Sequence, residues 1–206
     1  MPDDERAVDA RLLAAAGSGN LRGLKSALAD GADPDARDAA GTPALMLATR
    51  ANRPDLVRAL IDAEADADAQ DAERFNPFLY AGAEGLLEIL MLTNEAGADP
   101  ALTNRYGGVA LIPASERGHV EVVRYLLSET DVDVDHVNKL GWTALLEAIL
   151  LSDGGPRHQE IVRLLIDNGA DVDLADGDGV RPLAHARARG HTAIAAMLEA
   201  AGARTG

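Results

Sequence analysis

Few side chains in this sequence have the types and spacing that catalysis or metal binding requires. The run Asp131-Val-Asp-Val-Asp135 is similar to the start of a calcium-binding loop. Such a loop needs a glycine at its sixth position and a bidentate glutamate at its twelfth, and this chain has His136 and Trp142 there. The five histidines lack metal-site spacing, and there is no Gly-x-x-x-x-Gly-Lys or Gly-x-Ser-x-Gly motif. We therefore expect no metal, no cofactor and no enzymatic activity.

Glu147 and His185 are the strongest candidates for a catalytic or ligand-anchoring pair. Both fall at a repeated position, described below, that is otherwise Leu47, Tyr80 or Pro113 and is normally turned into the core. We expect them on neighbouring helices with axes about 10 Å apart. Because a buried charge is costly unless it is paired, the alternative is a structural ion pair or hydrogen bond. We favour this structural interpretation, because no nucleophile or set of metal ligands converges with the two residues.

These side chains are positioned by a repeat in the sequence. One pattern begins at Asp38, Asp71, Asn104, Asn138 and Asp176, at steps of 33, 33, 34 and 38 residues. Each unit has a Gly-containing turn, a short apolar helix, a break and a second helix. One such unit cannot bury its apolar face alone, so neighbouring units must stack into a continuous core. The period therefore predicts a repeat architecture.

The repeated motif resembles the ankyrin repeat. Its first-helix signature is similar to three segments of the chain, Gly41-Thr-Pro-Ala-Leu-Met-Leu-Ala48, Gly141-Trp-Thr-Ala-Leu-Leu-Glu-Ala148 and Gly179-Val-Arg-Pro-Leu-Ala-His-Ala186. The resemblance covers about residues 5–203 and implies an all-α ankyrin-repeat solenoid, a single domain over residues 1–206. Its six repeats would span residues 5–37, 38–70, 71–103, 104–137, 138–175 and 176–203. The chain also looks like small stand-alone bacterial ankyrin-repeat proteins, which implies a bacterial source and no known catalytic activity.

The turn after each second helix should adopt a left-handed backbone. Gly31 begins one such turn, Gly-Ala-Asp, and glycine takes this conformation without strain. Glu64 and Asp131 stand at the same position in repeats two and four. We therefore expect strained or reshaped helix ends there, and fraying of residues 204–206.

The resemblance also implies where a partner would bind, because ankyrin-type stacks recognise partners with hairpin tips and the exposed ends of first helices, which form a concave face. By register, this face would carry Phe75, Glu84, Arg105, Tyr106, Glu116, Arg117, Leu140, Trp142, Val180 and Arg189. Phe75, Tyr106 and Trp142 fall on consecutive hairpins, and aromatic residues are enriched in binding hot spots. Alternatively, these rings brace the hairpins.

Repeat five also carries an insertion of five residues between its two helices, within segment 152–159. Insertions in solenoids often lie on the binding face, so we add its Arg157 and His158 to the candidate binding residues. A tolerated surface loop is the alternative, because lengthening a loop costs little free energy.

The formal net charge of −15 excludes some classes of partner. Phosphates would be repelled, so we expect no nucleic-acid and no anionic membrane binding. A basic partner would be attracted, although we favour solubility as the reason for the acidity. No apolar run is long enough to span a bilayer, and the acidic N-terminus does not resemble a signal peptide. We expect a cytoplasmic monomer.

The sequence therefore predicts a non-enzymatic protein–protein interaction module that binds a protein or peptide on its concave hairpin and first-helix face. The alternative is a small-ligand-binding or hydrolytic site at repeats five and six, around Glu147, His185 and the 152–159 insertion. A closed pocket beneath the insertion, lined by convergent polar groups, would favour this alternative.

Overall fold

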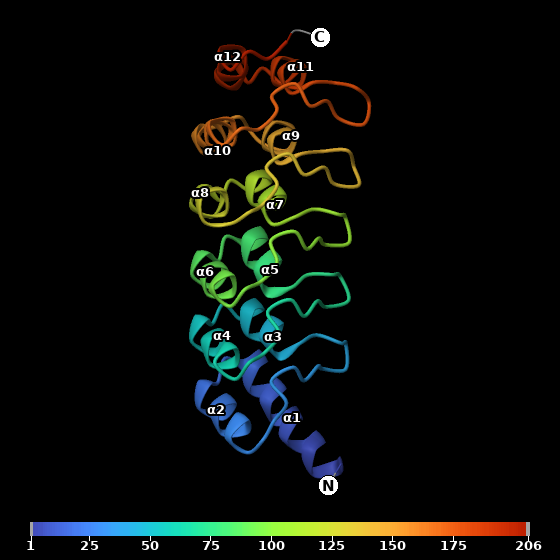
Figure 1. Ribbon diagram of the computed structural model, residues 1–206, viewed down its shortest axis with the longest axis vertical. Coiled ribbons are helices and arrows are strands. Elements are labelled where there is room, and N and C mark those ends of the chain that lie inside the picture. The colour runs from blue at the N-terminus through green and yellow to red at the C-terminus, as the bar shows by residue number, and fades with distance from the viewer. Residues whose placement is uncertain (1, 205–206) are drawn as a thin grey trace. The chain divides into compact units, whose positions relative to one another are not determined.

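The computed structural model describes the backbone of residues 2–204 and the side chains of residues 6–204. Within residues 2–204 the chain forms twelve helices and no strand, which confirms the predicted all-α class. The helices follow one another in six pairs (Figure 1): α1 (Pro2–Ser18) and α2 (Leu21–Ala29), α3 (Ala44–Arg50) and α4 (Pro54–Ile61), α5 (Pro77–Glu84) and α6 (Leu87–Glu95), α7 (Leu111–Glu116) and α8 (Val120–Glu129), α9 (Ala144–Leu150) and α10 (Pro156–Asp167), α11 (Pro182–Ala188) and α12 (Thr192–Ala200).

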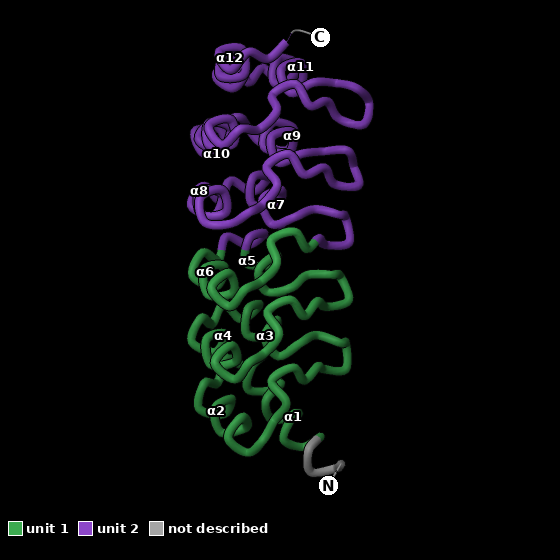
Figure 2. The backbone as a smooth tube through the Cα atoms, in the orientation of Figure 1, with its two compact units in different colours: residues 1–81, 86–102 green, residues 82–85, 103–206 purple. Residues whose placement is uncertain are grey.

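The chain divides into two compact units (Figure 2). Unit 1 comprises Met1–Ala81 and Leu86–Leu102, and unit 2 comprises Gly82–Gly85 and Thr103–Gly206. The boundary passes through α5 and then between repeats three and four. The predicted single domain over residues 1–206 stays a prediction.

Within each unit, the first helices of the pairs form one layer and the second helices form another (Figure 1). In unit 2, α9 packs between α7 and α11, and α10 packs between α8 and α12. The core between the layers is made of small and medium apolar side chains, such as the fully buried Leu145, Ala148, Ile161 and Leu165. Burying one leucine or isoleucine stabilises the fold by about 1.5–3 kcal/mol, so the paired helices depend on their stacked neighbours.

The ends of the second helices follow the expectation from sequence. Gly31 has a φ of 89°, and Glu64 is held at a φ of 64° in the same turn. A side chain in this conformation costs about 1–2 kcal/mol, so the end of repeat two is strained as predicted. Repeat four is reshaped instead: Thr130, which follows the last residue of α8, is extended with φ −138° and ψ 160°, and its hydroxyl donates to the Leu126 carbonyl at 2.6 Å.

Hydrogen bonds hold the C-terminal segment in place as far as Arg204. The Arg204 backbone N–H donates to Oδ1 of Asp173 at 2.8 Å, and its Nε donates to Oδ2 at 2.6 Å. The expectation that Arg204 frays was therefore wrong, because Asp173 fixes both its backbone and its side chain. Residues 205–206 lie outside the described residues.

Candidate functional site

Each hairpin is built on the first residue of its repeat. In repeat five, Oδ1 of Asn138 accepts the backbone N–H groups of Leu140 at 2.9 Å and of Trp142 at 3.1 Å. The equivalent pair of bonds is made by four further residues, Asp38, Asp71, Asn104 and Asp176. A short side chain that bonds the backbone two residues later is typical of such turns. The hairpin tips are thus held in a fixed conformation before any partner arrives.

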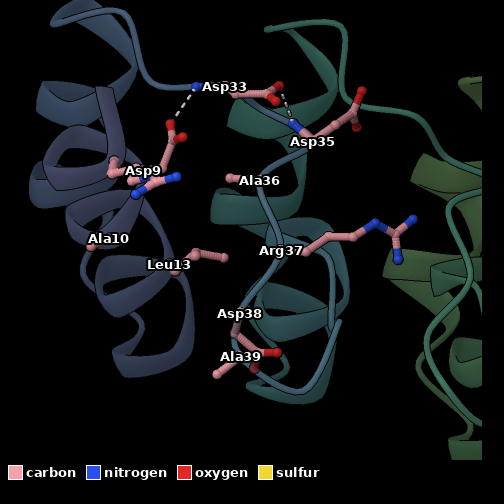
Figure 3. Close-up of a pocket in the computed structure, with 10 residues that line it drawn as sticks. Asp9, Ala10, Leu13, Asp33, Asp35, Ala36, Arg37, Asp38 and Ala39 are labelled. Atoms are coloured by element: carbon pink, nitrogen blue, oxygen red, sulfur yellow. Dashed lines mark hydrogen bonds between the residues drawn. The ribbon is translucent and has the colours of Figure 1, made fainter. Parts of the chain in front are cut away.

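A second set of carboxylates links neighbouring repeats. Oδ1 of Asp135 accepts the backbone N–H of Asp171 in the next repeat at 2.9 Å. The same link joins Asp35 to Asp66, Asp68 to Asp99 and Asp173 to Arg204. Repeat one has no hairpin, and there Asp9 of α1 accepts the N–H of Asp33 at 2.8 Å (Figure 3). The sequence did not lead us to predict these inter-repeat carboxylates, although an Asp-x-Asp pattern follows most of the second helices.

The aspartates among the hairpin-opening residues and the inter-repeat residues give the acidity of the chain a structural cause. Each backbone N–H that they accept would otherwise lack a protein acceptor, and a hydrogen bond to a charged group contributes about 1.5–3 kcal/mol. Part of the net charge of −15 therefore serves the turns and the junctions between repeats. Neither solubility nor a basic partner is needed to explain that part.

The largest exposed apolar side chains of unit 2's hairpins lie in repeats four and five. Tyr106 is 51% exposed, Leu140 59% and Val137 46%. The Lys139 N–H donates to the Tyr106 carbonyl at 3.0 Å, which joins the two hairpins. We call Tyr106, Val137 and Leu140 the tip surface. Trp142, predicted to belong to the same face, is half-buried, and Val137 was missed because it precedes the hairpin motif.

Arg105 lies beside the tip surface. Its guanidinium carbon is 4.8 Å from the centre of the Tyr106 ring, and its Nη2 donates to the Tyr106 hydroxyl at 2.7 Å. The Lys139 ammonium donates to the Arg105 carbonyl at 2.8 Å. The tip surface therefore has a cationic border that also orients the tyrosine.

In unit 1, Phe75 has a bracing role. Its ring meets Tyr80 edge-on, with the ring centres 6.1 Å apart, and the Arg50 guanidinium lies over the Tyr80 ring, 5.8 Å from its centre. Arg50 also donates to Asp71, the first residue of the Phe75 hairpin, at 2.5 Å. Phe75 thus fits the alternative in which a ring braces its hairpin, whereas Tyr106 extends into solvent.

The remaining residues of the predicted face are dispersed. Arg117 pairs with Glu84 and donates to the Ala83 carbonyl at 2.8 Å, which links α7 to the end of α5. Arg189 is exposed at the end of α11, and Val180 is half-buried in the last hairpin. Their role in binding stays a prediction.

The insertion in repeat five is an ordered turn. Gln159 Nε2 donates to the Gly154 carbonyl at 2.7 Å, and the Gly155 N–H donates to Asp153 Oδ1 at 2.8 Å. This N–H is the main reason that the pKa of Asp153 is lowered, with the nearby His158 adding to the effect. His158 lies within 2.9 Å of the Glu116 carbonyl, and Arg157 is exposed.

The insertion also takes part in contacts between a glycine of one repeat and a histidine of the next. His119 packs on Gly85 of the preceding repeat, His158 packs on Gly118, and His191 packs on Gly154 within the insertion. Gly154 has a φ of 66°, and a Cβ there would lie 2.3 Å from the His191 ring. The insertion therefore has a structural role, and its role in binding stays a prediction.

Glu147 and His185 have separate partners, which corrects the predicted pair. The Asn138 side chain donates to Glu147 Oε1 at 2.8 Å, and His185 Nε2 lies 2.7 Å from Asp176 Oδ2. Each side chain thus bonds the first residue of its own hairpin. An acid–base pair is not assembled.

The two environments differ in their charge. Burial raises the pKa of Glu147 to about 7, and the nearby charge of Glu116 adds to this effect while the Asn138 hydrogen bond opposes it. At Asp176, burial also acts to raise the pKa, but hydrogen bonds from the Val180 N–H and from His185 outweigh it and lower the pKa. Glu147 is therefore a carboxyl with a pKa of about 7, and it makes no salt bridge with any cation among residues 6–204.

A groove of about 500 Å³ lies in unit 1 between α1 and the first hairpin (Figure 3). Its lining includes Asp9, Leu13, Asp33 and Arg37, and the Arg37 side chain extends away from α1. Neither Glu147 nor the insertion lines this groove. Among the described residues, no group of His, Asp or Glu side chains could hold a metal ion. No helix among them is long and apolar enough to cross a membrane.

The paired helices, the hairpins and the Gly-His contacts define a stack of helix-turn-helix repeats. Family models described as ankyrin repeats (3 copies) match residues 12–104 and 79–176, and one described as ankyrin repeats (many copies) matches residues 156–199. The chain belongs to the ankyrin repeat family. Proteins of this family are in general non-enzymatic protein-interaction modules.

Two bacterial proteins of similar length are among the relatives. The chain is 44% identical over 191 residues to the ankyrin repeat protein YahD of Escherichia coli (strain K12), covering 93% of this chain and 95% of that protein. An ankyrin repeat domain from Acinetobacter baumannii AYE shares 52% identity and superposes with a TM-score of 0.91, covering 94% of this chain and 98% of that domain. The ankyrin repeat protein EF0377 shares 38% identity with a TM-score of 0.90, over 93% and 97% of the two chains.

Proposed function

We propose that the protein is a non-enzymatic module that binds a protein or peptide through the tip surface of repeats four and five and the first helices behind it. The observation that carries this proposal is the exposure of Tyr106, Val137 and Leu140, between 46% and 59%, on two hairpins joined by a hydrogen bond. Burying such side chains in an interface removes apolar surface from water, which stabilises the complex.

The construction of the hairpins supports the same proposal. The side chains of Asn104 and Asn138 hold their tips by two backbone hydrogen bonds each. A surface that is already ordered loses little conformational entropy on binding, and this loss is a main cost of association. Arg105 and Lys139 at the border add polar contacts of the kind found at an interface rim.

The other expectations about partners remain part of the proposal. The net charge of −15 disfavours nucleic acids and anionic membranes as partners. A cytoplasmic monomer remains our expectation. The small-ligand or hydrolytic site is not proposed, because Glu147 and His185 bond different residues.

The double variant Tyr106→Ala/Leu140→Ala tests the proposal. Proteins from the source cell that crosslink to the wild type should be lost from this variant, because truncating hot-spot residues costs about 2–4 kcal/mol of binding. The control is Met91→Ala, which removes a 38% exposed apolar side chain from the second helix α6. The melting temperature of both variants should stay close to that of the wild type. Retention of the same proteins by the double variant would refute the proposed surface.

A further inference from the structure

Equivalent positions at two junctions between repeats differ in their charge. Between repeats two and three, these positions are Arg50, Asp71 and Tyr80, and between repeats four and five they are Glu116, Asn138 and Glu147. In each case the first residue ends a first helix, the second opens the next hairpin, and the third lies on the next first helix. The first junction thus shows which chemical group fits at this place in the fold.

At the first junction the chain supplies its own cation. The Arg50 guanidinium donates to Asp71 at 2.5 Å and lies 5.8 Å from the centre of the Tyr80 ring. The Asp71 side chain is only 2% exposed, whereas that of Arg50 is 38% exposed. A guanidinium can therefore enter this junction from the surface and pair with a buried carboxylate.

At the second junction the cation is replaced by a carboxylate. Glu147 is buried, with 5% of the residue exposed. Glu147 accepts one hydrogen bond, from the neutral amide of Asn138 at 2.8 Å. The salt bridges of residues 6–204 include neither Glu116 nor Glu147. A buried carboxylate without a cation is costly, and Glu116 adds to this cost.

We propose that an arginine side chain of the partner enters the junction between repeats four and five and pairs with Glu147 and Glu116, as Arg50 pairs with Asp71 within the chain. This inference rests on the proposed function and names the chemistry of the partner. The site adjoins the tip surface, because Asn138 binds Glu147 through its Nδ2 and holds Leu140 through its Oδ1. A planar guanidinium also suits two carboxylates, to which it donates through separate N–H groups.

The model compound N-acetyl-arginine amide is the probe for this site. Titrated into the 15N-labelled full chain at pH 8, it should shift the Asn138 side-chain signal in a saturable way. N-acetyl-citrulline amide, which has the same shape without the charge, should not. In Glu147→Gln the affinity should fall at least about tenfold, the factor that 1.4 kcal/mol represents. The matched control Glu121→Gln removes an exposed carboxylate from α8 of repeat four and should bind as the wild type does.

Glu116→Arg provides a second, independent variant. It places a cation where Arg50 lies in the first junction, so its guanidinium should pair with Glu147, raise the melting temperature and block the probe. Binding should also weaken between pH 8 and pH 6, because protonation removes the charge of Glu147. The groups that face it are Glu116, a carboxylate of α7, and the neutral amide of Asn138 from its hairpin.

The outcomes separate this inference from the proposed function. If the arginine probe fails to bind the wild type, or binds Glu147→Gln equally well, the arginine site is wrong. The tip surface would then still stand if Tyr106→Ala/Leu140→Ala loses its partner. If N-acetyl-lysine amide binds as tightly as N-acetyl-arginine amide, the site recognises positive charge alone, and the assignment of a guanidinium is overturned.

Discussion

The substitution Glu147→Gln should make the protein more stable at high pH. The carboxyl is 5% exposed and bonds Asn138 alone, so its ionised form is disfavoured in the folded state. A glutamine keeps the shape and the oxygen that accepts from Asn138, but it carries no charge. The substitution therefore isolates the free-energy cost of ionising this side chain inside the fold.

The size of the effect follows from the pKa. Burial raises the pKa of Glu147 from 4.5 to about 7, and a tenfold change in proton affinity is worth about 1.4 kcal/mol. The ionised form thus costs about 3 kcal/mol more in the folded than in the unfolded chain. Between pH 4.5 and pH 7 the folded state binds more protons than the unfolded state, so the stability contributed by this group falls as pH rises. Above pH 7 the full cost remains.

Urea unfolding of the wild type and Glu147→Gln at several pH values measures this cost. The free energy of unfolding of the variant, relative to the wild type, should rise by about 2 kcal/mol between pH 5.5 and pH 8. Taking the difference cancels the titration of groups common to both proteins. Glu121→Gln should show a difference that hardly depends on pH. A flat difference for Glu147→Gln as well would show that the carboxyl is solvated, and would refute the reasoning.

Three further predictions concern the junctions and turns. Asp135→Ala should lower the free energy of unfolding by about 1–3 kcal/mol, because the Asp171 N–H loses its acceptor. Glu64→Gly should raise it by about 1 kcal/mol, since glycine adopts the φ of 64° without strain. In a double-mutant cycle, Glu147→Ala and His185→Ala should be additive within about 0.5 kcal/mol, because the two side chains have separate partners.

Each of these predictions has a matched control or a contrary outcome. The control for Asp135→Ala is Asp178→Ala, which removes an exposed carboxylate at a hairpin tip. It should leave the free energy of unfolding nearly unchanged in the same urea experiment. Asp62→Gly, placed in the helical conformation at the end of α4, should destabilise where Glu64→Gly stabilises. A coupling above 1 kcal/mol between Glu147 and His185 would show that the two residues interact after all.

The fold was predictable because the repeat constrains the backbone. The apolar period gave the helix pairs, and the Gly-Ala-Asp turns gave the ends of the second helices. The departures from this turn were predicted as well: Glu64 is strained, and the end of repeat four, near Asp131, is reshaped. The division of the chain between Leu102 and Thr103 was not predicted, because the motif continues across it.

The partners of polar side chains were harder to predict. Register correctly placed Glu147 and His185 at equivalent positions of adjacent repeats, but it does not say whether a side chain turns toward the next repeat or toward its own hairpin. The structure shows the second choice, with Asn138 and Asp176 as the partners. Phe75 follows Asp71 by four residues and packs on Tyr80, whereas Tyr106 follows Asn104 by two residues and is exposed.

The junctions show how one backbone can carry different surfaces. The residues that open the hairpins must be Asp or Asn, because the turn needs an oxygen that accepts two N–H groups. Their second side-chain atom is not constrained by the turn, so it bonds whatever the neighbouring helix offers: Arg50 at Asp71, Glu147 at Asn138 and His185 at Asp176. A change at the helix position therefore alters the charge of a junction without altering its turn. For this reason, chemical specificity in this chain should be sought at these second contacts, which the repeat motif leaves variable.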